Sequence, residues 1–369
     1  PTNTKIRERL QKTLYLERIR IKTDPWEVDP EDENEFWSKI KKQLFVADPT
    51  LIEEHKSQEL HQEMLHEIVS RYTHEICGNF KPGVFWMARQ VLRRMFARLF
   101  NAHFGGFKGL FYPDEKLKDK LIVAGPVEKI RNLISKGTVI LVPTHFSNLD
   151  SVIIGFGMDY IGLPAFQYGA GLNLFNSKMF NLLMSNLGPY KLDRRKKNPI
   201  YVETLKAYSK TNVIAGANTI FFPGGTRSRA GNIENELKLG LLGTVMEAQR
   251  EHYFTNPSTL ATKIFVVPLT ISYPFVLEAS SLIEEHLKRT GKEQYLTQEN
   301  NMPPWKTVWK FFWETFSKSS EITLSLGDPM DVFGNNLDDD GNSLDKLERK
   351  IDVRQYFMNK GVMKVDAQR

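Results

Sequence analysis

His145 and Asp150 are the two residues of this sequence whose types and spacing most directly suggest catalysis. A carboxylate can fix the tautomer of a neighbouring imidazole, and a neutral imidazole can take a proton from a hydroxyl group as a general base. A simpler interpretation is that Asp150 closes a helix-capping box begun by Ser147 and that His145 is a polar loop residue. Considered alone, the segment favours the simpler interpretation, so the choice depends on the rest of the chain.

The flanking segments would hold His145 at the edge of a sheet. The run from Gly137 to Pro143 is short, uncharged and rich in β-branched residues, which predicts a buried strand. The Ser-x-x-Asp pattern after it predicts a helix over Asn148–Met158. In open α/β sheets, ligands bind where strands end and helices begin, and a helix amino terminus favours the neutral imidazole. We therefore expect His145 to face a ligand site.

A second polar loop follows another predicted buried strand, Asn218–Pro223. The loop, Gly224–Gly231, carries Arg227 and Arg229 among glycines that let the backbone approach a ligand closely. Guanidinium groups bind phosphate or carboxylate through paired hydrogen bonds, so this loop is a candidate anion site, although arginines that only improve solubility are the alternative. The candidate phosphate-binding residues are Arg194, Arg227, Arg229 and Lys238.

The basic run Arg194–Lys197 has three open interpretations. It could bind a phosphate group, contact anionic lipid, or lie on the surface as a solvated approach to the helix that begins at Pro199. For Arg195–Lys197, solvated surface is as good an interpretation as either kind of binding.

Composition limits the class of protein and its surroundings. The chain of 369 residues is long enough for one large domain or two moderate ones, and its net charge of +6 favours anionic partners. The single cysteine, Cys77, excludes an internal disulfide framework, fits a reducing compartment, and is expected to be a small buried residue. No secretory signal is expected, and no run reaches the about 20 apolar residues needed to cross a bilayer. We expect a soluble or peripheral membrane protein of the cytoplasm or the plastid stroma.

The chain divides into three predicted regions. The sequence of residues 1–120 predicts a helical region with amphipathic segments, interrupted by an acidic linker at Trp26–Glu35. Residues 121–335 alternate strands and helices, which predicts an α/β domain with a mostly parallel central sheet flanked by helices. The sequence of residues 336–369 predicts a polar loop and a helical tail. No internal repeat is expected in the chain. The basic, aromatic helix Gly83–Phe107 fits either a membrane interface or a core helix with a solvated basic face.

Four segments together resemble the signature blocks of the glycerolipid acyltransferases, the family with the His-x4-Asp motif. Thr144–Asp150 is similar to the first block, Gly188–Tyr201 to the second, Phe221–Gly231 to the third, and Ile264–Tyr273 to the fourth. Their order and spacing agree over about residues 138 to 275, and the second and third blocks look more like the glycerol-3-phosphate acyltransferase branch. One departure is Gly224, which stands where the family usually has glutamate.

This resemblance implies acyl transfer from a thioester, acyl-ACP or acyl-CoA, to the sn-1 hydroxyl of glycerol 3-phosphate. His145 would be the base and Asp150 its partner, while the four phosphate-binding candidates would orient the acceptor. No cofactor, metal or nucleic acid is implied, whereas a membrane surface is expected because the product is amphiphilic. The residues expected to support the loop and the oxyanion are Ser147, Asn148, Gly225 and Thr226.

Other functions stay open from the sequence. A 1-acylglycerol-3-phosphate acyltransferase and a membrane-binding relative without activity are the main alternatives, the second because of Gly224. A nucleotide-binding enzyme is disfavoured since neither a Walker loop nor a G-x-G-x-x-G segment is present. A nucleic-acid binder is disfavoured because the aromatic residues lie on amphipathic stripes and not among the basic clusters. The candidates for an apolar acyl tunnel are Phe175, Met179, Phe180, Leu183 and Met184, for which core packing is the alternative.

Overall fold

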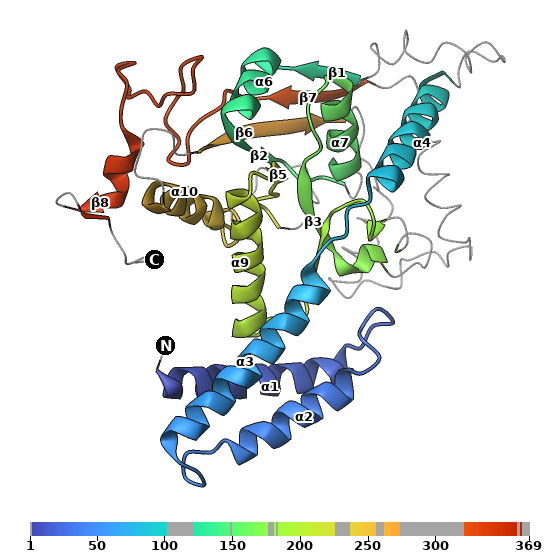
Figure 1. Cartoon of the computed structure of the whole chain (residues 1–369). Coiled ribbons are helices and arrows are strands. Elements are labelled where there is room, and N and C mark those ends of the chain that lie inside the picture. Colours follow the sequence, from blue (N-terminus) through green and yellow to red (C-terminus); the bar gives the residue numbers. More distant parts are fainter. Residues whose placement is uncertain are drawn as a thin grey trace, which may run out of the picture. The chain divides into compact units, whose positions relative to one another are not determined.

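A computed structural model shows the chain as two compact units (Figure 1). The structure describes residues 2–101, 121–147, 150–175, 181, 184–225, 237–255, 262–273, 321–359 and 362–363. The first unit joins Pro1–Phe85 with Gln167–Ala215, and the second joins Trp86–Phe166 with Gly216–Arg369. The units therefore do not follow the linear boundaries at 120 and 335, because a segment from the middle of the chain groups with the N-terminal helices.

The second unit contains a mostly parallel sheet, as the sequence predicts. The described strands of this unit follow the order β1-β7-β6-β2-β5. Strand β2 pairs in parallel with both β5 and β6, and β1 pairs in parallel with β7, whereas β6 and β7 form the one antiparallel pair among these described strands. The strands are β1 (Leu121–Ala124), β2 (Gly137–Pro143), β5 (Thr219–Ile220), β6 (Lys263–Ser272) and β7 (Ile322–Leu326).

Helices accompany this sheet at the places where the apolar periodicity predicts them. In α6, the fully buried Ile130 and Leu133 lie three positions apart on one face, and Gly137 directly follows the helix. Helix α10 begins at Gly243, where the N–H groups of Gly243 and Thr244 donate to the carbonyl groups of Leu239 and Leu241 in the preceding turn. The described helices of this unit are α4 (Pro82–Asn101, which begins in the first unit), α6 (Val127–Lys136), α7 (Asp150–Tyr160) and α10 (Gly243–Thr255).

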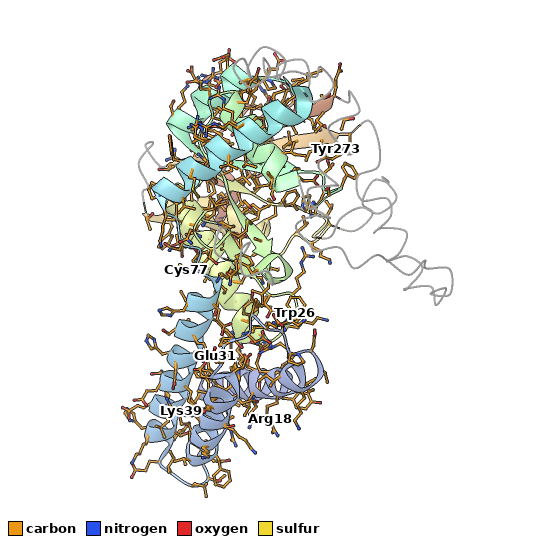
Figure 2. The ribbon with its side chains drawn as sticks, turned by 90° about the vertical axis from the view of Figure 1, so that its right-hand side faces the viewer. Arg18, Trp26, Glu31, Lys39, Cys77 and Tyr273 are labelled. Carbon is orange, nitrogen blue, oxygen red and sulfur yellow. The ribbon has the colours of Figure 1, made fainter. Side chains whose placement is uncertain are left out.

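The first unit is mainly helical, which confirms the predicted helical N-terminal region over the described residues. Its helices pack apolar stripes together, and the most deeply buried side chains include Leu10, Ile40, Met64 and Ile68. Cys77, by contrast, is exposed at the end of α3, so the expectation of a buried cysteine was wrong (Figure 2). The described elements of this unit include α1 (Asn3–Thr23), α2 (Glu33–Val46), α3 (Glu54–Ile76), α9 (Pro199–Ile214) and the parallel strands β3 (Gln167–Gly171) and β4 (Tyr190–Leu192).

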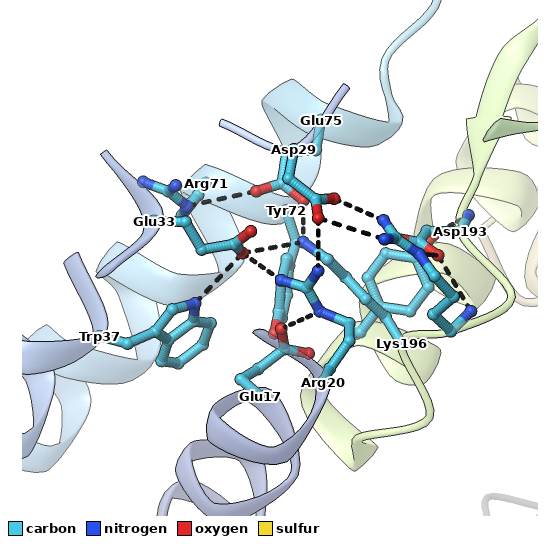
Figure 3. A network of polar contacts seen from close by, with 12 residues as sticks. Glu17, Arg20, Asp29, Glu33, Trp37, Arg71, Tyr72, Glu75, Asp193 and Lys196 are labelled. Carbon is cyan, nitrogen blue, oxygen red and sulfur yellow. Dashed lines mark hydrogen bonds and ion pairs between the residues drawn. The ribbon is translucent and has the colours of Figure 1, made fainter. Parts of the chain in front are cut away.

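A buried network of charges connects the N-terminal helices to the start of α9 (Figure 3). The Arg20 guanidinium, 4% exposed, donates to Glu17 at 2.8 Å and to Asp29 at 3.1 Å, and it also pairs with Glu33. Burial alone would raise the pKa of Asp29, but hydrogen bonds from Arg195 and the Trp26 N–H and the charges of both arginines lower it. Two carboxylates of the predicted acidic linker, Asp29 and Glu33, therefore compensate buried cations of this unit, whereas Glu31 and Asp32 are exposed.

The same network corrects the solvated-surface interpretation of the basic run. Lys196 is 2% exposed and pairs with Glu75 and Glu33, while burial raises the pKa of Glu75 despite the lysine. Arg195 pairs with Asp29 and with Asp193, the latter at 2.8 Å. Only Arg194 and Lys197 of this run are exposed.

Residues 330–352 contain a seven-residue repeat, which the sequence analysis did not expect. Asp331, Asp338 and Asp345 each begin a turn in which the carboxylate accepts backbone N–H groups from the residues two and four positions later. The spacing of Asp-x-x-Gly-Asn over the first two turns is the signal that could have revealed it. The residue three positions after each aspartate has a positive φ: Gly334 (+86°), Gly341 (+78°) and Glu348 (+60°).

Over residues 353–359 and 362–363, the chain does not form the predicted helical tail. These described residues hold a single 3-10 turn at Val353–Phe357 and a short antiparallel pair of strands, β8 (Met358–Asn359) and β9 (Val362–Met363). Among the described residues, no helix is both long and apolar enough to pass through a bilayer.

Candidate active site

His145 and Asp150 form a hydrogen-bonded pair just beyond the end of β2. The Nδ1 atom of His145 lies 2.8 Å from Oδ2 of Asp150, and the carboxylate is fully buried while the imidazole is 15% exposed. The pair results from a tight turn, because Pro143 ends the strand and Asp150 is already the first residue of α7. The geometry brings together the two residues that the sequence singles out.

The capping interpretation of Asp150 holds at the same time as the catalytic one. Its Oδ2 atom also accepts the backbone N–H of Ser147 at 2.9 Å, which is the reciprocal bond of a capping box, and that of Phe146 at 2.6 Å. One carboxylate oxygen thus ties the turn together and holds the imidazole. The two N–H groups point at Asp150, so they support the loop.

The contacts of the imidazole determine which nitrogen can act as a base. A carboxylate that already accepts two N–H groups requires a proton on Nδ1 of His145, which leaves the lone pair on Nε2. The ring lies against Phe222, with centroids 4.3 Å apart and planes inclined by 36°. Within the described residues nothing hydrogen-bonds to Nε2, so this atom can accept a proton from a bound hydroxyl group.

Tyr273 also belongs to this site, although the sequence analysis gave it no role. Its hydroxyl group donates to Oδ1 of Asp150 at 2.5 Å, so donors approach both oxygens of the carboxylate. Tyr273 directly follows β6, which pairs with β2 in parallel. The signal in the sequence was its place at the end of the fourth signature-like segment, but only the pairing register brings it to Asp150.

The loop after β5 brings two further predicted site residues together. Gly225 has a φ of +65° and donates its N–H to the carbonyl group of Phe222, while the N–H of Lys238 donates to Pro223. A Cβ atom at Gly225 would lie 2.7 Å from Cδ of Lys238, so the aliphatic part of the lysine side chain packs directly on the glycine. Because Phe222 also contacts His145, the exposed Lys238 lies on the loop adjoining the imidazole.

Comparison with known proteins decides the family of this region. Residues 126–272 match the family model described as Acyltransferase. The dihydroxyacetone phosphate acyltransferase of Homo sapiens is 27% identical over 229 residues, or 61% of this chain and 30% of its own. The glycerol-3-phosphate acyltransferase of Alteromonas mediterranea is 23% identical over 262 residues, or 70% of this chain and 28% of its own. Residues 126–272 of this chain form an acyltransferase domain.

The relatives of this acyltransferase domain are much longer proteins. The dihydroxyacetone phosphate acyltransferase of Oryctolagus cuniculus is 31% identical over 156 residues, which cover 41% of this chain and 22% of that protein. This chain therefore spans less than a third of the length of the curated relatives it matches. A crystal structure of the 1-acyl-sn-glycerophosphate acyltransferase PlsC from Thermotoga maritima aligns with 73% of this chain and 76% of its own at 16% identity and a TM-score of 0.33.

The acyltransferase domain carries some predicted site residues in parts of the chain that the structure does not describe. Arg194 lies exposed in the turn after β4, in the first unit. Of the tunnel candidates, Phe175 is buried and Met184 is half-buried in the same unit. The predicted residues outside the described part are Asn148, Met179, Phe180, Leu183, Thr226, Arg227 and Arg229.

Proposed function

We propose that this chain transfers a fatty acyl group from a thioester, acyl-ACP or acyl-CoA, to the sn-1 hydroxyl group of glycerol 3-phosphate, giving lysophosphatidic acid. The observation that supports this most directly is the buried Asp150 carboxylate holding the Nδ1 side of His145 beside a strand end. That arrangement holds the imidazole through Nδ1 and leaves Nε2 as the nitrogen that can take a proton, as general-base catalysis requires.

In this mechanism His145 removes the proton of the acceptor hydroxyl group while the hydroxyl oxygen attacks the thioester carbonyl. Asp150 stabilises the imidazolium that forms, and the imidazolium then returns the proton to the departing thiolate. The acceptor oxygen is itself the nucleophile, so the chain needs no acyl-enzyme. Since the N–H groups of Phe146 and Ser147 donate to Asp150, we assign oxyanion support to Asn148 and Thr226.

The acceptor would be held by its phosphate group. We assign this role to Arg227 and Arg229, together with Arg194 and Lys238, because guanidinium and ammonium groups bind phosphate dianions strongly. The contact of Lys238 with Gly225 supports the assignment for the lysine. A second acceptor, dihydroxyacetone phosphate, is suggested by the names of several relatives, and it also carries a primary hydroxyl group on a three-carbon phosphate.

We further propose that α4 contacts a membrane surface, where an amphiphilic product would leave. Trp86, Met87 and Val91 are 62%, 50% and 55% exposed along this helix, and Arg94 is exposed beside them. An exposed apolar stripe next to cationic side chains is typical of helices that lie in the headgroup region of a bilayer. The positive net charge would favour anionic lipid and an acidic carrier protein alike.

The test offers the purified chain three acceptors: glycerol 3-phosphate, dihydroxyacetone phosphate and 1-acylglycerol 3-phosphate. Each is combined with acyl-CoA or acyl-ACP, with and without vesicles of anionic lipid. We expect turnover of glycerol 3-phosphate, faster than of the 1-acyl compound, and chain bound to the vesicles in a salt-sensitive manner. Turnover confined to the 1-acyl acceptor would overturn the proposed substrate, and no turnover of any pair would overturn the activity.

A further inference from the structure

We propose that Tyr273 is a positioning residue of this site, which fixes the Asp150 carboxylate so that the carboxylate in turn fixes His145. This inference rests on the proposed function, because it assigns a role in the proton transfer. The contact that carries it is the hydrogen bond of 2.5 Å from the Tyr273 hydroxyl group to Oδ1 of Asp150.

The backbone pairing of β6 with β2 fixes the position of Tyr273 beside Asp150. Strand β6 pairs with the whole of β2, with Pro143 opposite Leu269. The pairing continues past the end of β2, because the N–H of Thr144 donates to Leu269 at 3.1 Å and the Thr144 hydroxyl accepts the N–H of Ile271 at 3.4 Å. Thr144, which directly precedes His145, is therefore hydrogen-bonded to two of the β6 residues that precede Tyr273.

The Tyr273 hydroxyl completes the set of donors around a fully buried carboxylate. Oδ2 of Asp150 accepts Nδ1 of His145 and the N–H groups of Phe146 and Ser147, all on one side. Oδ1 faces the tyrosine. A buried carboxylate with one oxygen lacking this donor would turn about its Cβ–Cγ bond, because an unpaired buried acceptor is costly. This rotation would weaken the hydrogen bond that sets the tautomer of His145.

A purely structural role for Tyr273 makes a different prediction. If the side chain only filled space at the end of β6, removing its oxygen would leave the imidazole unchanged, because the ring would still pack. A positioning role requires that the same small change alters the tautomer of His145 and the rate of the chemical step.

The test is Tyr273→Phe in the full chain, compared with Tyr356→Phe as a matched control. Tyr356 is half-exposed, and its ring packs on Phe333, so this control removes a hydroxyl group far in sequence from the site. We expect Tyr273→Phe to lower kcat about 10- to 100-fold with little change in KM for the phosphorylated acceptor, as expected of an interaction that acts on the transition state. We expect the control to match the parent chain.

A second measurement keeps the inference testable without turnover. In chains labelled with ¹⁵N-histidine, the two ring nitrogens report the tautomer, and His145→Gln assigns the His145 signals. We expect a single Nδ1–H tautomer in the parent chain and a mixture of tautomers in Tyr273→Phe, in a chain that stays folded and melts only a few degrees lower.

The outcomes separate this inference from the proposed function. Unchanged kcat and an unchanged tautomer in Tyr273→Phe would overturn the positioning role while leaving the acyltransferase intact. An altered tautomer in Tyr273→Phe, together with no turnover of any substrate pair by the parent chain, would support the positioning role and overturn the proposed function.

Discussion

At the scale of single residues, the chemistry of the site depends on the Asp150 carboxylate, which accepts hydrogen bonds both from His145 and from its own turn. Asp150 has a negative charge to stabilise an imidazolium and a shape that accepts N–H groups from its own turn. These two contributions can be separated, since asparagine has nearly the same shape without the charge.

Asp150→Asn should lower turnover while leaving the turn in place. Its amide oxygen can take the position of Oδ2 and its NH₂ group can donate to the Tyr273 oxygen, so the tautomer of His145 is kept and only the charge is lost. We expect kcat to fall about 100- to 1,000-fold, less than in chymotrypsin-type enzymes, where the same substitution also changes the tautomer and costs roughly 10,000-fold. Steady-state kinetics with glycerol 3-phosphate measure this, and the ¹⁵N spectrum of His145 is the control.

If Asp150→Asn retained parental turnover, the carboxylate would be a helix cap and no more. In that case the simpler interpretation would hold, in which Asp150 belongs to a helix-capping box and His145 is a polar loop residue.

The sequence predicted the local part of this site and missed the non-local part. His145 and Asp150 are joined by a turn of a few residues, whose proline and capping pattern are visible in the sequence. Tyr273 lies 123 positions from Asp150, and only the register of β2 against β6 joins them. The same reason explains the burial of Arg195, whose partner Asp29 lies 166 positions away.

At the scale of elements, the seven-residue repeat shows how one local rule builds an irregular region. Each aspartate accepts N–H groups of its own turn, and these bonds with Asn342 and Lys350 lower the pKa of Asp338 although partial burial would raise it. The third turn departs from the other two because Glu348 adopts the positive φ that glycine takes in the first and second turns.

Glu348→Gly should therefore stabilise the chain. A left-handed backbone costs a non-glycine residue about 1–2 kcal/mol, and the greater freedom of glycine in the unfolded state offsets roughly 0.5–1 kcal/mol of the gain. Because the Glu348 side chain is exposed, its loss removes little packing. We expect a net stabilisation of about 0.5–1 kcal/mol, measured as slower amide hydrogen exchange in residues 344–352.

The matched control is Gly341→Ala, in the second turn. Its φ of +78° and the position of its Cβ, 2.9 Å from Cδ2 of Leu133, predict a destabilisation. If Glu348→Gly accelerated exchange or Gly341→Ala slowed it, positive φ would not be the factor that governs these turns.

At the scale of the whole molecule, the chain combines an acyltransferase domain with helices for which the sequence showed no motif. The mostly parallel sheet could be predicted because its strands are apolar runs separated by amphipathic helices. The grouping of residues 167–215 with the N-terminal helices could not, because it depends on charge pairs such as Lys196 with Glu75. Each member of such a pair looks solvated when its partner is unknown.

The most direct test of the central claim is the rate of acyl transfer to glycerol 3-phosphate by His145→Ala, measured beside the parent chain with the same thioester. Removing a general base should lower the rate about 100- to 10,000-fold, while the melting temperature and vesicle binding stay at parental values. A His145→Ala chain that transfers acyl groups at the parental rate would contradict the account, because the imidazole held by Asp150 would then have no part in the reaction.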